Sequence, residues 1–272
     1  MRCLYVDLDG TLLGPDASLL TGADGSFSLL GVRALEACAR AGAEVVIYSG
    51  RRQSSVFDAA RLIGSSAFIF ELGCGVVLDG ELEWLTDGLM PSADKGTIFE
   101  QIEASGAPAL LLERFPGRLE YHTPWAANRD VSHLFRGHVD VAEVHATLEA
   151  AGFGWLRLTD NGVIRAVAEH LSGLAAVHAY HLLPAGASKA RAVARHMQAR
   201  GYAREDCIAV GDSREDMEAA SVVDTFWLVA NALERDRSLE ANVAGRAGVR
   251  VASESYGAGV YEAVVSTLAE WR

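Results

Sequence analysis

Two aspartates near the start of the chain have the types and spacing of a phosphoryl-transfer site. Asp7 and Asp9 follow the short apolar run Cys3–Val6, and Gly10 and Thr11 come directly after them. Carboxylates are the hard oxygen ligands that Mg²⁺ prefers, and a carboxylate beside the metal can be the nucleophile that accepts a phosphoryl group. An Asp-Gly pair is also a common turn signal, so these residues alone leave a simple turn open.

Polar residues also follow three other runs that the sequence predicts to be strands. They are Ser49, Gly50 and Arg51 after residues 45–48, Asp212 and Asp216 after residues 208–210, and Asn231 after residues 226–229. Lys189 stands at the start of a predicted helix, where its ammonium would add to the positive helix end. Ligands of a doubly wound sheet bind beyond the carboxyl ends of its parallel strands, so we expect the clusters to meet there.

The aspartates supply the nucleophile, the acid and the metal ligands. We expect Asp7 to attack phosphorus, and Asp9 to protonate the leaving oxygen and later to deprotonate the water. We expect Asp7, Asp212 and Asp9, the last through its backbone carbonyl, to hold Mg²⁺.

The other clusters would bind the phosphoryl oxygens. Ser49, the Gly50 amide and Lys189 would orient these oxygens and neutralise their charge, and Lys189 thereby joins the catalytic group. Asp216 follows Asp212 by one helical turn, where it would either bind a metal-ligated water or hold Lys189 in place. The expected supporting residues are Asp216, Arg51 and Asn231.

Strand-like and helix-like segments alternate in the first third of the chain and again from Ser188 onward. This alternation predicts an α/β core with a doubly wound, Rossmann-like parallel sheet. The intervening part mixes predicted helices at 97–104 and 141–151 with predicted strands at 109–112, 119–122, 155–158 and 177–182, and a predicted turn at 159–162. We therefore expect a core of residues 1–87 and 184–272 and an inserted α+β cap of residues 88–183.

Composition excludes several classes of protein. The chain has 272 residues, of which 50% are hydrophobic, and a formal net charge of -12. This charge disfavours nonspecific binding to nucleic acid or to anionic membranes. Because we find neither a signal peptide nor an apolar run of about 20 residues, we expect a cytoplasmic protein. The oligomeric state is left open.

The cysteine spacing gives no covalent or metal framework. Cys3, Cys38, Cys74 and Cys207 lie far apart and form no CxxC pair. Free cysteine in an apolar run behaves as a small hydrophobe, so we expect neither a disulfide nor a zinc framework.

Residues 7–13 and 211–216 resemble the first and fourth motifs of the haloacid dehalogenase (HAD) superfamily. Ser49 and Lys189 are similar to its second and third motifs, and the resemblance covers the predicted core. An insert between the second and third motifs is typical of the C2 cap type, found in sugar-phosphate phosphatases. The resemblance implies a Mg²⁺-dependent phosphatase with an aspartyl-phosphate intermediate.

Substrate choice is expected to depend on the cap, whose densest polar stretch is residues 129–138. Arg129 and Arg136 are the predicted contacts to a second anionic group or to sugar hydroxyls, and a solvated cap edge is the alternative. The leading hypothesis is a phosphomonoester hydrolase for a small phosphorylated metabolite, a sugar phosphate or a sugar-acid phosphate. A phosphomutase and a non-catalytic phosphometabolite-binding protein are the alternatives. Residues 13–27 form either a mobile flap or an ordered surface loop.

Overall fold

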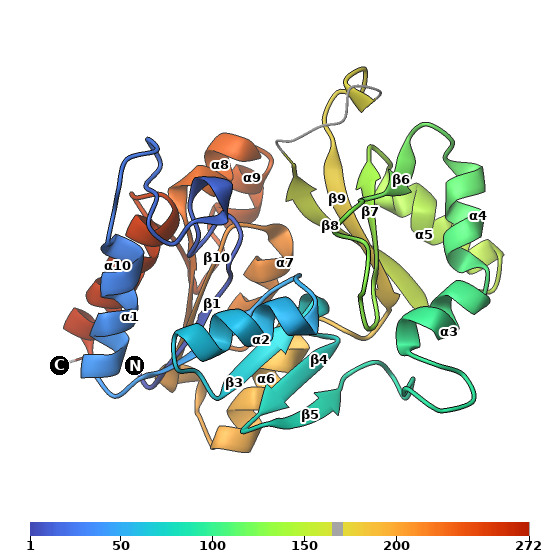
Figure 1. Ribbon diagram of the computed structural model, residues 1–272. Helices are drawn as coiled ribbons and strands as arrows, with labels where there is room; N and C mark the ends of the chain where they lie inside the picture. The colour runs from blue at the N-terminus through green and yellow to red at the C-terminus, as the bar shows by residue number, and fades with distance from the viewer. Residues whose placement is uncertain (165–170, 272) are drawn as a thin grey trace. The chain divides into compact units, whose positions relative to one another are not determined.

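The computed structural model describes residues 1–164 and 171–271. The chain divides into two compact units. The core unit consists of Met1–Glu83 and Ser188–Arg272, and the insert unit consists of Trp84–Ala187. Both chain ends belong to the core unit (Figure 1).

In the part of the core unit that the structure describes, eight strands form one sheet in the order β12-β11-β10-β1-β2-β3-β4-β5 (Figure 1). The strands are β1 (Cys3–Val6), β2 (Glu44–Tyr48), β3 (Ala67–Phe70), β4 (Gly75–Leu78), β5 (Glu81–Trp84), β10 (Cys207–Gly211), β11 (Thr225–Leu228) and β12 (Val249–Val251). The strands from β12 to β3 are parallel, and β4 runs antiparallel to β3. The doubly wound α/β core predicted from the alternation is therefore confirmed.

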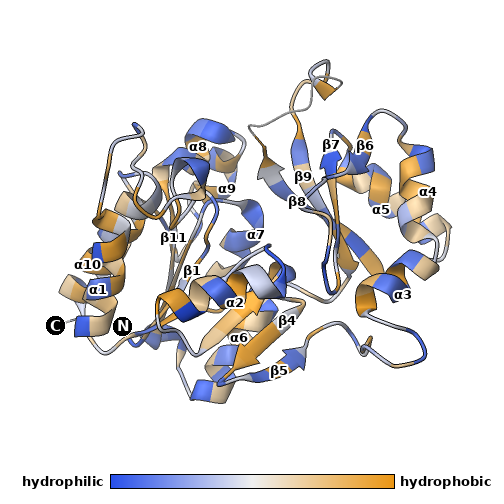
Figure 2. Ribbon diagram, in the orientation of Figure 1, coloured by the Kyte–Doolittle hydropathy of each residue, from blue (hydrophilic) through white to orange (hydrophobic). Residues whose placement is uncertain are grey.

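Burial explains why these runs form strands. β1, β3, β10 and β11 are buried along their whole length, as expected for parallel strands covered on both faces. β5 lies at the edge of the sheet and begins with two exposed residues. Figure 2 shows the contrast, with β4 mostly hydrophobic and β5 hydrophilic.

Helices cover both faces of the sheet. They are α1 (Leu30–Arg40), α2 (Gln53–Leu62), α6 (Lys189–Arg200), α7 (Arg214–Met217), α8 (Ala230–Arg235), α9 (Leu239–Val243) and α10 (Tyr256–Glu270), with 3-10 turns η2 (Glu71–Gly73), η4 (Arg204–Asp206) and η5 (Glu218–Ser221). α1 packs against α10, whereas α6 packs against α7 and η5. Right-handed crossovers place α1 and α2 on the face opposite α7.

The start of α6 is set by its cap. The Ser188 hydroxyl accepts a hydrogen bond from the Arg191 amide, and Gly201 ends the helix in the left-handed conformation with φ 64°. The predicted helix start at Lys189 is confirmed. Lys189 is therefore the first residue of the helix.

The described part of the insert unit contains a four-stranded antiparallel sheet in the order β6-β7-β9-β8. The strands are β6 (Leu119–Tyr121), β7 (His133–Gly137), β8 (Leu156–Val163) and β9 (His178–Pro184), and the helices are α3 (Ile98–Ala104), α4 (Ala107–Arg114) and α5 (Val141–Ala150). The Thr97 hydroxyl and the Glu100 carboxylate form a capping box at the start of α3. The expected α+β insert is confirmed.

Two secondary-structure predictions in the insert are wrong. Residues 109–112, predicted as a strand, lie inside α4, which follows the left-handed Gly106 and has Pro108 in its first turn. Residues 159–162, predicted as a turn, lie inside β8, where the pairing with β9 shifts register between Asp160 and Val163. A short apolar run does not distinguish helix from strand, and an Asp-Asn-Gly sequence marks a strand irregularity as well as it marks a turn.

Local hydrogen bonds organise residues 13–27. The segment contains the 3-10 turn η1 (Pro15–Ala17) and an antiparallel bridge between Thr21 and Phe27. The Gly22 amide donates to the Ser26 carbonyl at 2.8 Å. These contacts give the segment a defined local structure, which either the flap or the surface loop would have.

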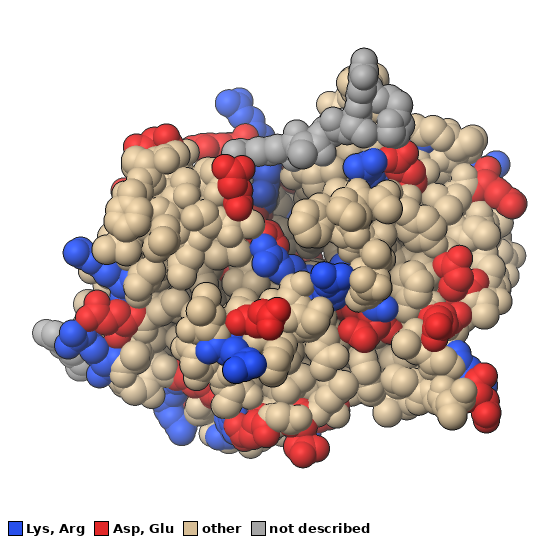
Figure 3. Space-filling model, viewed as in Figure 1, with Lys and Arg blue, Asp and Glu red and all other residues tan. Residues whose placement is uncertain are grey.

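Two features of the described residues bear on possible membrane or nucleic-acid partners, namely the helices and the surface charges. Among the residues described, no helix combines the length and the apolar composition that crossing a bilayer requires. Figure 3 shows basic side chains interspersed with acidic ones on the viewed face.

Candidate active site

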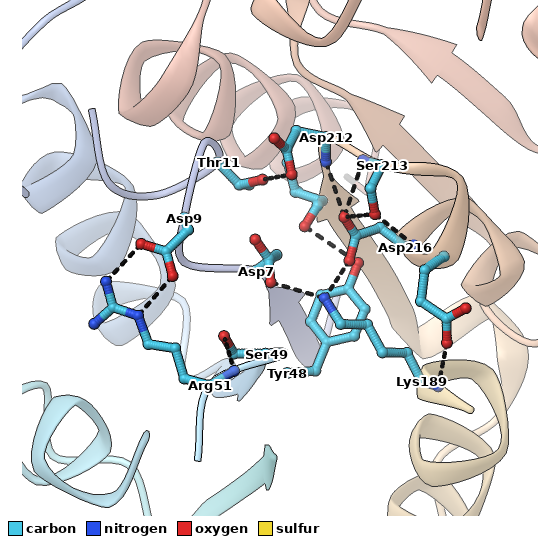
Figure 4. A network of polar contacts seen from close by, with 12 residues as sticks. Asp7, Asp9, Thr11, Tyr48, Ser49, Arg51, Lys189, Asp212, Ser213 and Asp216 are labelled. Carbon is cyan, nitrogen blue, oxygen red and sulfur yellow. Dashed lines mark hydrogen bonds and ion pairs between the residues drawn. The ribbon is translucent and has the colours of Figure 1, made fainter. Parts of the chain in front are cut away.

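The carboxyl ends of three neighbouring strands bring the predicted clusters together. β1 pairs in parallel with β2 on one side and with β10 on the other. Asp7, Ser49 and Asp212 follow these strands directly and therefore emerge at one edge of the sheet (Figure 4). Lys189 reaches the same place from the first turn of α6.

The ammonium of Lys189 lies between two carboxylates. Its Nζ is 2.8 Å from Asp7 Oδ1 and 2.5 Å from Asp216 Oδ1, and it also lies 4.7 Å from the centre of the Tyr48 ring. The side chain is 1% exposed. Burial lowers the pKa of Lys189, but Asp216 and Asp7 raise it by more, so the net pKa is above the usual value and the group stays charged.

Asp7 is a buried carboxylate with one engaged oxygen. Oδ1 accepts the hydrogen bond from Lys189, and no hydrogen bond from the described residues reaches Oδ2. Burial raises the pKa of Asp7, Lys189 opposes this, and the net pKa is well above the usual value. Asp216 and Asp212 contribute to the rise through their negative charge.

Asp212 is held by residues from two other segments. The Thr11 hydroxyl donates to Oδ1 at 3.3 Å, and the Arg235 guanidinium donates to Oδ2. Burial raises the pKa of Asp212, and Arg235 partly opposes the rise. Gly10 has φ 86°, and a Cβ there would lie 2.2 Å from Asp212 Oδ2, so the close approach of the two loops requires glycine.

Asp216 belongs to the support of the site. Its Oδ2 accepts hydrogen bonds from the amides of Asp212 and Ser213 and from the Ser213 hydroxyl, and its Oδ1 accepts from Lys189. Ser213 and Asp216 also form a capping box at the start of α7. Of the two roles predicted for Asp216, holding Lys189 in place is the one for which the structure shows a direct contact.

The acidic cluster has the donor set of a hard divalent cation. Carboxylate oxygens of Asp7, Asp212 and Asp216 lie within 4.8 Å of one another. Three carboxylates face two cations, Lys189 and Arg235, which leaves an excess of negative charge. All-oxygen donors and uncompensated negative charge both fit Mg²⁺.

The Asp9 carboxylate lies outside this cluster. It is 54% exposed and accepts two hydrogen bonds from Arg51, at 2.6 and 2.5 Å. The pair of Arg51 with Asp9 ties the second predicted cluster to the first, and the Arg51 amide donates to the Ser49 hydroxyl at 3.2 Å within the second cluster (Figure 4). The predicted metal contact of Asp9 thus depends on its backbone carbonyl.

Comparisons with known proteins agree with this geometry. Residues 175–243 match the family model described as haloacid dehalogenase-like hydrolase. A phosphoglycolate phosphatase of Pyrobaculum neutrophilum is 30% identical over 254 residues, covering 91% of each chain. The chain belongs to the haloacid dehalogenase-like hydrolase family. A phosphoglycolate phosphatase of Halorubrum lacusprofundi is 29% identical over 234 residues and 84% of each chain.

Solved structures share the fold of this HAD hydrolase. The sucrose-phosphatase of Synechocystis sp. PCC6803, solved with sucrose and phosphate, aligns over 98% of each chain with a TM-score of 0.68 and 17% identity. A phosphatase of the same superfamily from Bacteroides thetaiotaomicron aligns over 98% of this chain and 95% of its own, with a TM-score of 0.64 and 16% identity. The HAD fold with a cap is thus confirmed, and the family and its relatives identify the chain as a phosphatase.

Asn231 supports the Asp9 loop of this HAD phosphatase. Its side-chain amide donates to the Gly10 carbonyl at 2.8 Å, and its side-chain oxygen accepts from the Tyr256 amide at 2.8 Å. Asn231 therefore links the start of α10 to the loop that carries the aspartates.

Sequence reasoning missed three residues of the site. Thr11 and Ser213 lie inside the first and fourth motifs, so their position in the sequence could have identified them. The Thr11 hydroxyl donates to Asp212, and the Ser213 hydroxyl donates to Asp216. Arg235 had no local signal, because it lies on α8, a short helix that was not predicted, and meets Asp212 through the fold alone.

The predicted cap residues lie on the insert unit. Arg129 is 7% exposed, and its Nε donates to the Ser132 hydroxyl at 3.0 Å. Arg136 lies on β7, and its Nε donates to Glu120 Oε1 at 2.6 Å. The solvated-edge alternative is wrong for Arg129, because the stretch around it is packed into the unit. The roles of both arginines in substrate binding stay predictions.

Proposed function

We propose that this HAD phosphatase is a Mg²⁺-dependent phosphomonoester hydrolase that works through an aspartyl-phosphate on Asp7. The observation that carries the proposal is the state of the Asp7 carboxylate. It is buried, one oxygen is held by Lys189, and no described residue hydrogen-bonds the other oxygen. A buried, oriented carboxylate with a free oxygen is suited to attack on phosphorus.

The chain's own residues provide the metal ligands. Asp7 and Asp212 would hold Mg²⁺ together with the Asp9 carbonyl, while Asp216 stays engaged with Lys189 and Ser213. When bound, Mg²⁺ would offset the charge of the phosphoryl oxygens and of the reacting carboxylate.

The first step transfers the phosphoryl group to the protein. An Asp7 oxygen forms a bond to phosphorus as the ester P–O bond breaks, and Asp9 gives its proton to the leaving oxygen. Ser49, the Gly50 amide and Lys189 orient the three remaining oxygens. For Asp9 to carry a proton, one of its two contacts with Arg51 has to open.

The second step restores Asp7. Asp9 takes a proton from water, the water oxygen bonds to phosphorus, and the bond between Asp7 and phosphorus breaks with release of phosphate. Lys189 remains charged in both steps because Asp216 raises its pKa.

We propose a small phosphorylated acid as the substrate class, with 2-phosphoglycolate as the first compound to test. Two relatives, 29% and 30% identical over 84% and 91% of each chain, carry the name phosphoglycolate phosphatase, which supports this choice. Phosphorylated sugars and sugar acids are the next class, and the sucrose-phosphatase supports them only at the level of fold.

The test is release of inorganic phosphate from a panel of phosphorylated acids and sugars, with Mg²⁺ and with EDTA. We expect Mg²⁺-dependent release of inorganic phosphate from at least one compound. After the reaction is quenched with acid, phosphate should also be found on a peptide that contains Asp7. Isomerised product without free phosphate would instead identify a phosphomutase. Binding without turnover of any compound would identify a phosphometabolite-binding protein.

A further inference from the structure

A second cluster of metal-ligating side chains lies at the opposite end of the core sheet. Cys3, Glu44 and Cys207 are the first residues of β1, β2 and β10. In the strand register Cys3 lies opposite Cys207 on one side and opposite Glu44 on the other. Paired residues of neighbouring strands project to the same face of a sheet. The three side chains therefore form a row across three strands.

His196 of α6 completes the row. Ligand atoms of Cys3, Glu44 and His196 lie within 4.8 Å of one another, and His196 is fully buried. Its Nε2 is a buried nitrogen without a hydrogen-bond partner among the described residues, and it lies 3.5 Å from Glu44 Oε1. A buried ring nitrogen aimed at a thiol and a carboxylate is a metal-ligand arrangement.

The candidate ligands have outer hydrogen-bond partners. The Tyr5 hydroxyl lies 2.7 Å from Nδ1 of His196, which orients Nε2 toward the row. The Tyr202 hydroxyl donates to Glu44 Oε2 at 2.9 Å, and Arg200 Nε donates to Oε1 at 3.3 Å. Such partners orient ligands in metal sites. The Glu44 side chain is 17% exposed, which provides a path from solvent.

Cys3 and Cys207 are paired residues of the neighbouring strands β1 and β10. Burial raises the pKa of Cys3 well above its usual value. Both thiols are fully buried. The wide separation of Cys3 and Cys207 in the sequence indicated no zinc framework, but the pairing of β1 with β10 makes them neighbours.

We propose that Cys3, His196 and Glu44 bind one Zn²⁺ ion or a similar thiophilic divalent cation. One sulfur, one imidazole nitrogen and one carboxylate oxygen form a three-residue ligand set that zinc accepts and Mg²⁺ does not. Binding releases the thiol proton of Cys3 to solvent and uses a lone pair of the His196 ring. The hard acidic cluster and the sulfur-containing cluster therefore select different metals.

The zinc ion would link the helix of the catalytic lysine to the sheet. His196 and Lys189 both lie on α6, about two turns apart, and both are buried on its inner side. A bond from His196 through the metal to β1 and β2 would restrain the position of α6. The proposed role is structural, and it does not depend on the proposed reaction.

The test uses Co²⁺ as a spectroscopic probe on the full chain, stripped of metal, kept reduced and saturated with Mg²⁺ to fill the acidic cluster. One equivalent of Co²⁺ is expected to give a thiolate-to-cobalt charge-transfer absorption, which a carboxylate site cannot produce. Added Zn²⁺ should abolish this absorption and raise the melting temperature.

Variants assign the ligands. Cys3→Ser and His196→Gln are expected to weaken Co²⁺ binding at least about tenfold and to remove the rise in melting temperature with Zn²⁺. Cys38→Ser is the matched control, because Cys38 is a buried thiol on α1 outside the row, and it should keep the absorption. If the buried variants do not fold, Glu44→Gln at the partly exposed end serves in their place.

Two results would overturn the proposal. One is the absence of a charge-transfer absorption in the wild-type protein with Co²⁺. The other is an absorption that persists unchanged in folded Cys3→Ser, His196→Gln or Glu44→Gln protein.

Discussion

Arg51 binds both carboxylate oxygens of Asp9, with Nε 2.6 Å from Oδ2 and Nη2 2.5 Å from Oδ1. The proposed general acid is thus anchored at the edge of the site by a two-point ion pair. Arg51 is 30% exposed and Asp9 is 54% exposed, so the pair is only moderately stable and can open during turnover.

We predict that Arg51→Ala lowers kcat between about 10- and 100-fold, because Asp9 loses its anchor and samples unproductive rotamers. Arg51→Lys should restore only part of the rate, since an ammonium cannot make the two-point contact. Steady-state kinetics on the best substrate measure both. An unchanged kcat in Arg51→Ala would remove Arg51 from the positioning of Asp9.

Asp7→Asn should lower kcat by about a thousandfold or more while the protein remains folded, because an amide neither attacks phosphorus nor binds Mg²⁺ well. Phosphate release and circular dichroism check the two parts of this prediction. Wild-type turnover in a preparation free of contamination and deamidation would assign the nucleophile elsewhere.

Asp9→Asn should separate the two chemical steps. With an aryl phosphate, whose leaving group needs no proton, the first step should remain fast while the second slows about 100-fold or more. Rapid-mixing experiments should then show a burst of phenol equal to the enzyme concentration. A burst of the same size and decay in wild type and variant would argue against the base role of Asp9.

Asp216→Asn should destabilise the fold by about 3–5 kcal/mol, because Lys189 is left buried with one carboxylate instead of two. Glu270→Gln is the control, since Glu270 and its partner Arg250 are 58% and 45% exposed and the loss of this screened surface pair should be much smaller. Urea unfolding measures both. Equal losses in the two variants would show that the contact between Asp216 and Lys189 stabilises the fold no more than a surface ion pair does.

Stabilisation by Mg²⁺ should grow with pH. The pKa values of Asp7 and Asp212 lie above the ordinary 3.8 in the folded chain, chiefly because both carboxyls are buried. From about pH 4 upward the metal-free folded chain therefore holds protons that the unfolded chain has released, and its free energy of unfolding falls as pH rises through the raised pKa values. Mg²⁺ replaces those protons.

The measurement is the difference between the melting temperatures with Mg²⁺ and with EDTA. Titrating groups remote from the metal affect both melting temperatures equally, so their contribution cancels in the difference. We expect a larger difference at about pH 8 than at about pH 5. A difference that is constant or shrinks with pH would contradict the buried acidic metal site.

Gly10→Ala should weaken Mg²⁺ activation at least about tenfold, because a Cβ there would lie 2.2 Å from Asp212 Oδ2. Gly25→Ala is the matched control. Gly25 also has a positive φ of 80°, but a Cβ there meets no atom within 4 Å in the structure. It should cost only about 1 kcal/mol of backbone strain and leave Mg²⁺ activation unchanged. Activity as a function of Mg²⁺ concentration compares the two.

The sequence predicted the core of the site because its signals are local. Asp7, Ser49 and Asp212 each follow a buried apolar run, and parallel strands place such residues at one edge. Ser188 and Gly201 set the ends of α6 by local capping, so the position of Lys189 was also predictable. These inferences needed only the order of elements.

Contacts made by tertiary packing could not be predicted in the same way. Arg235 on α8 pairs with Asp212 at the end of β10. α8 is too short to show a helical periodicity, so the sequence did not predict it. β7 was missed because His133 and Arg136 made a buried strand resemble a polar edge. The register that places Cys3 beside Cys207 is likewise a property of the sheet, not of either segment.

The insert unit ends at Ala187, and the core unit resumes at Ser188, one residue before Lys189. Asp7, Asp212 and Asp216 also belong to the core unit, so the reacting groups occupy a module that is complete without the insert. A foreign insert could therefore be grafted between Glu83 and Ser188 without exchanging any of them. Recombination at these two junctions would let selection change what is recognised while the chemistry is inherited intact.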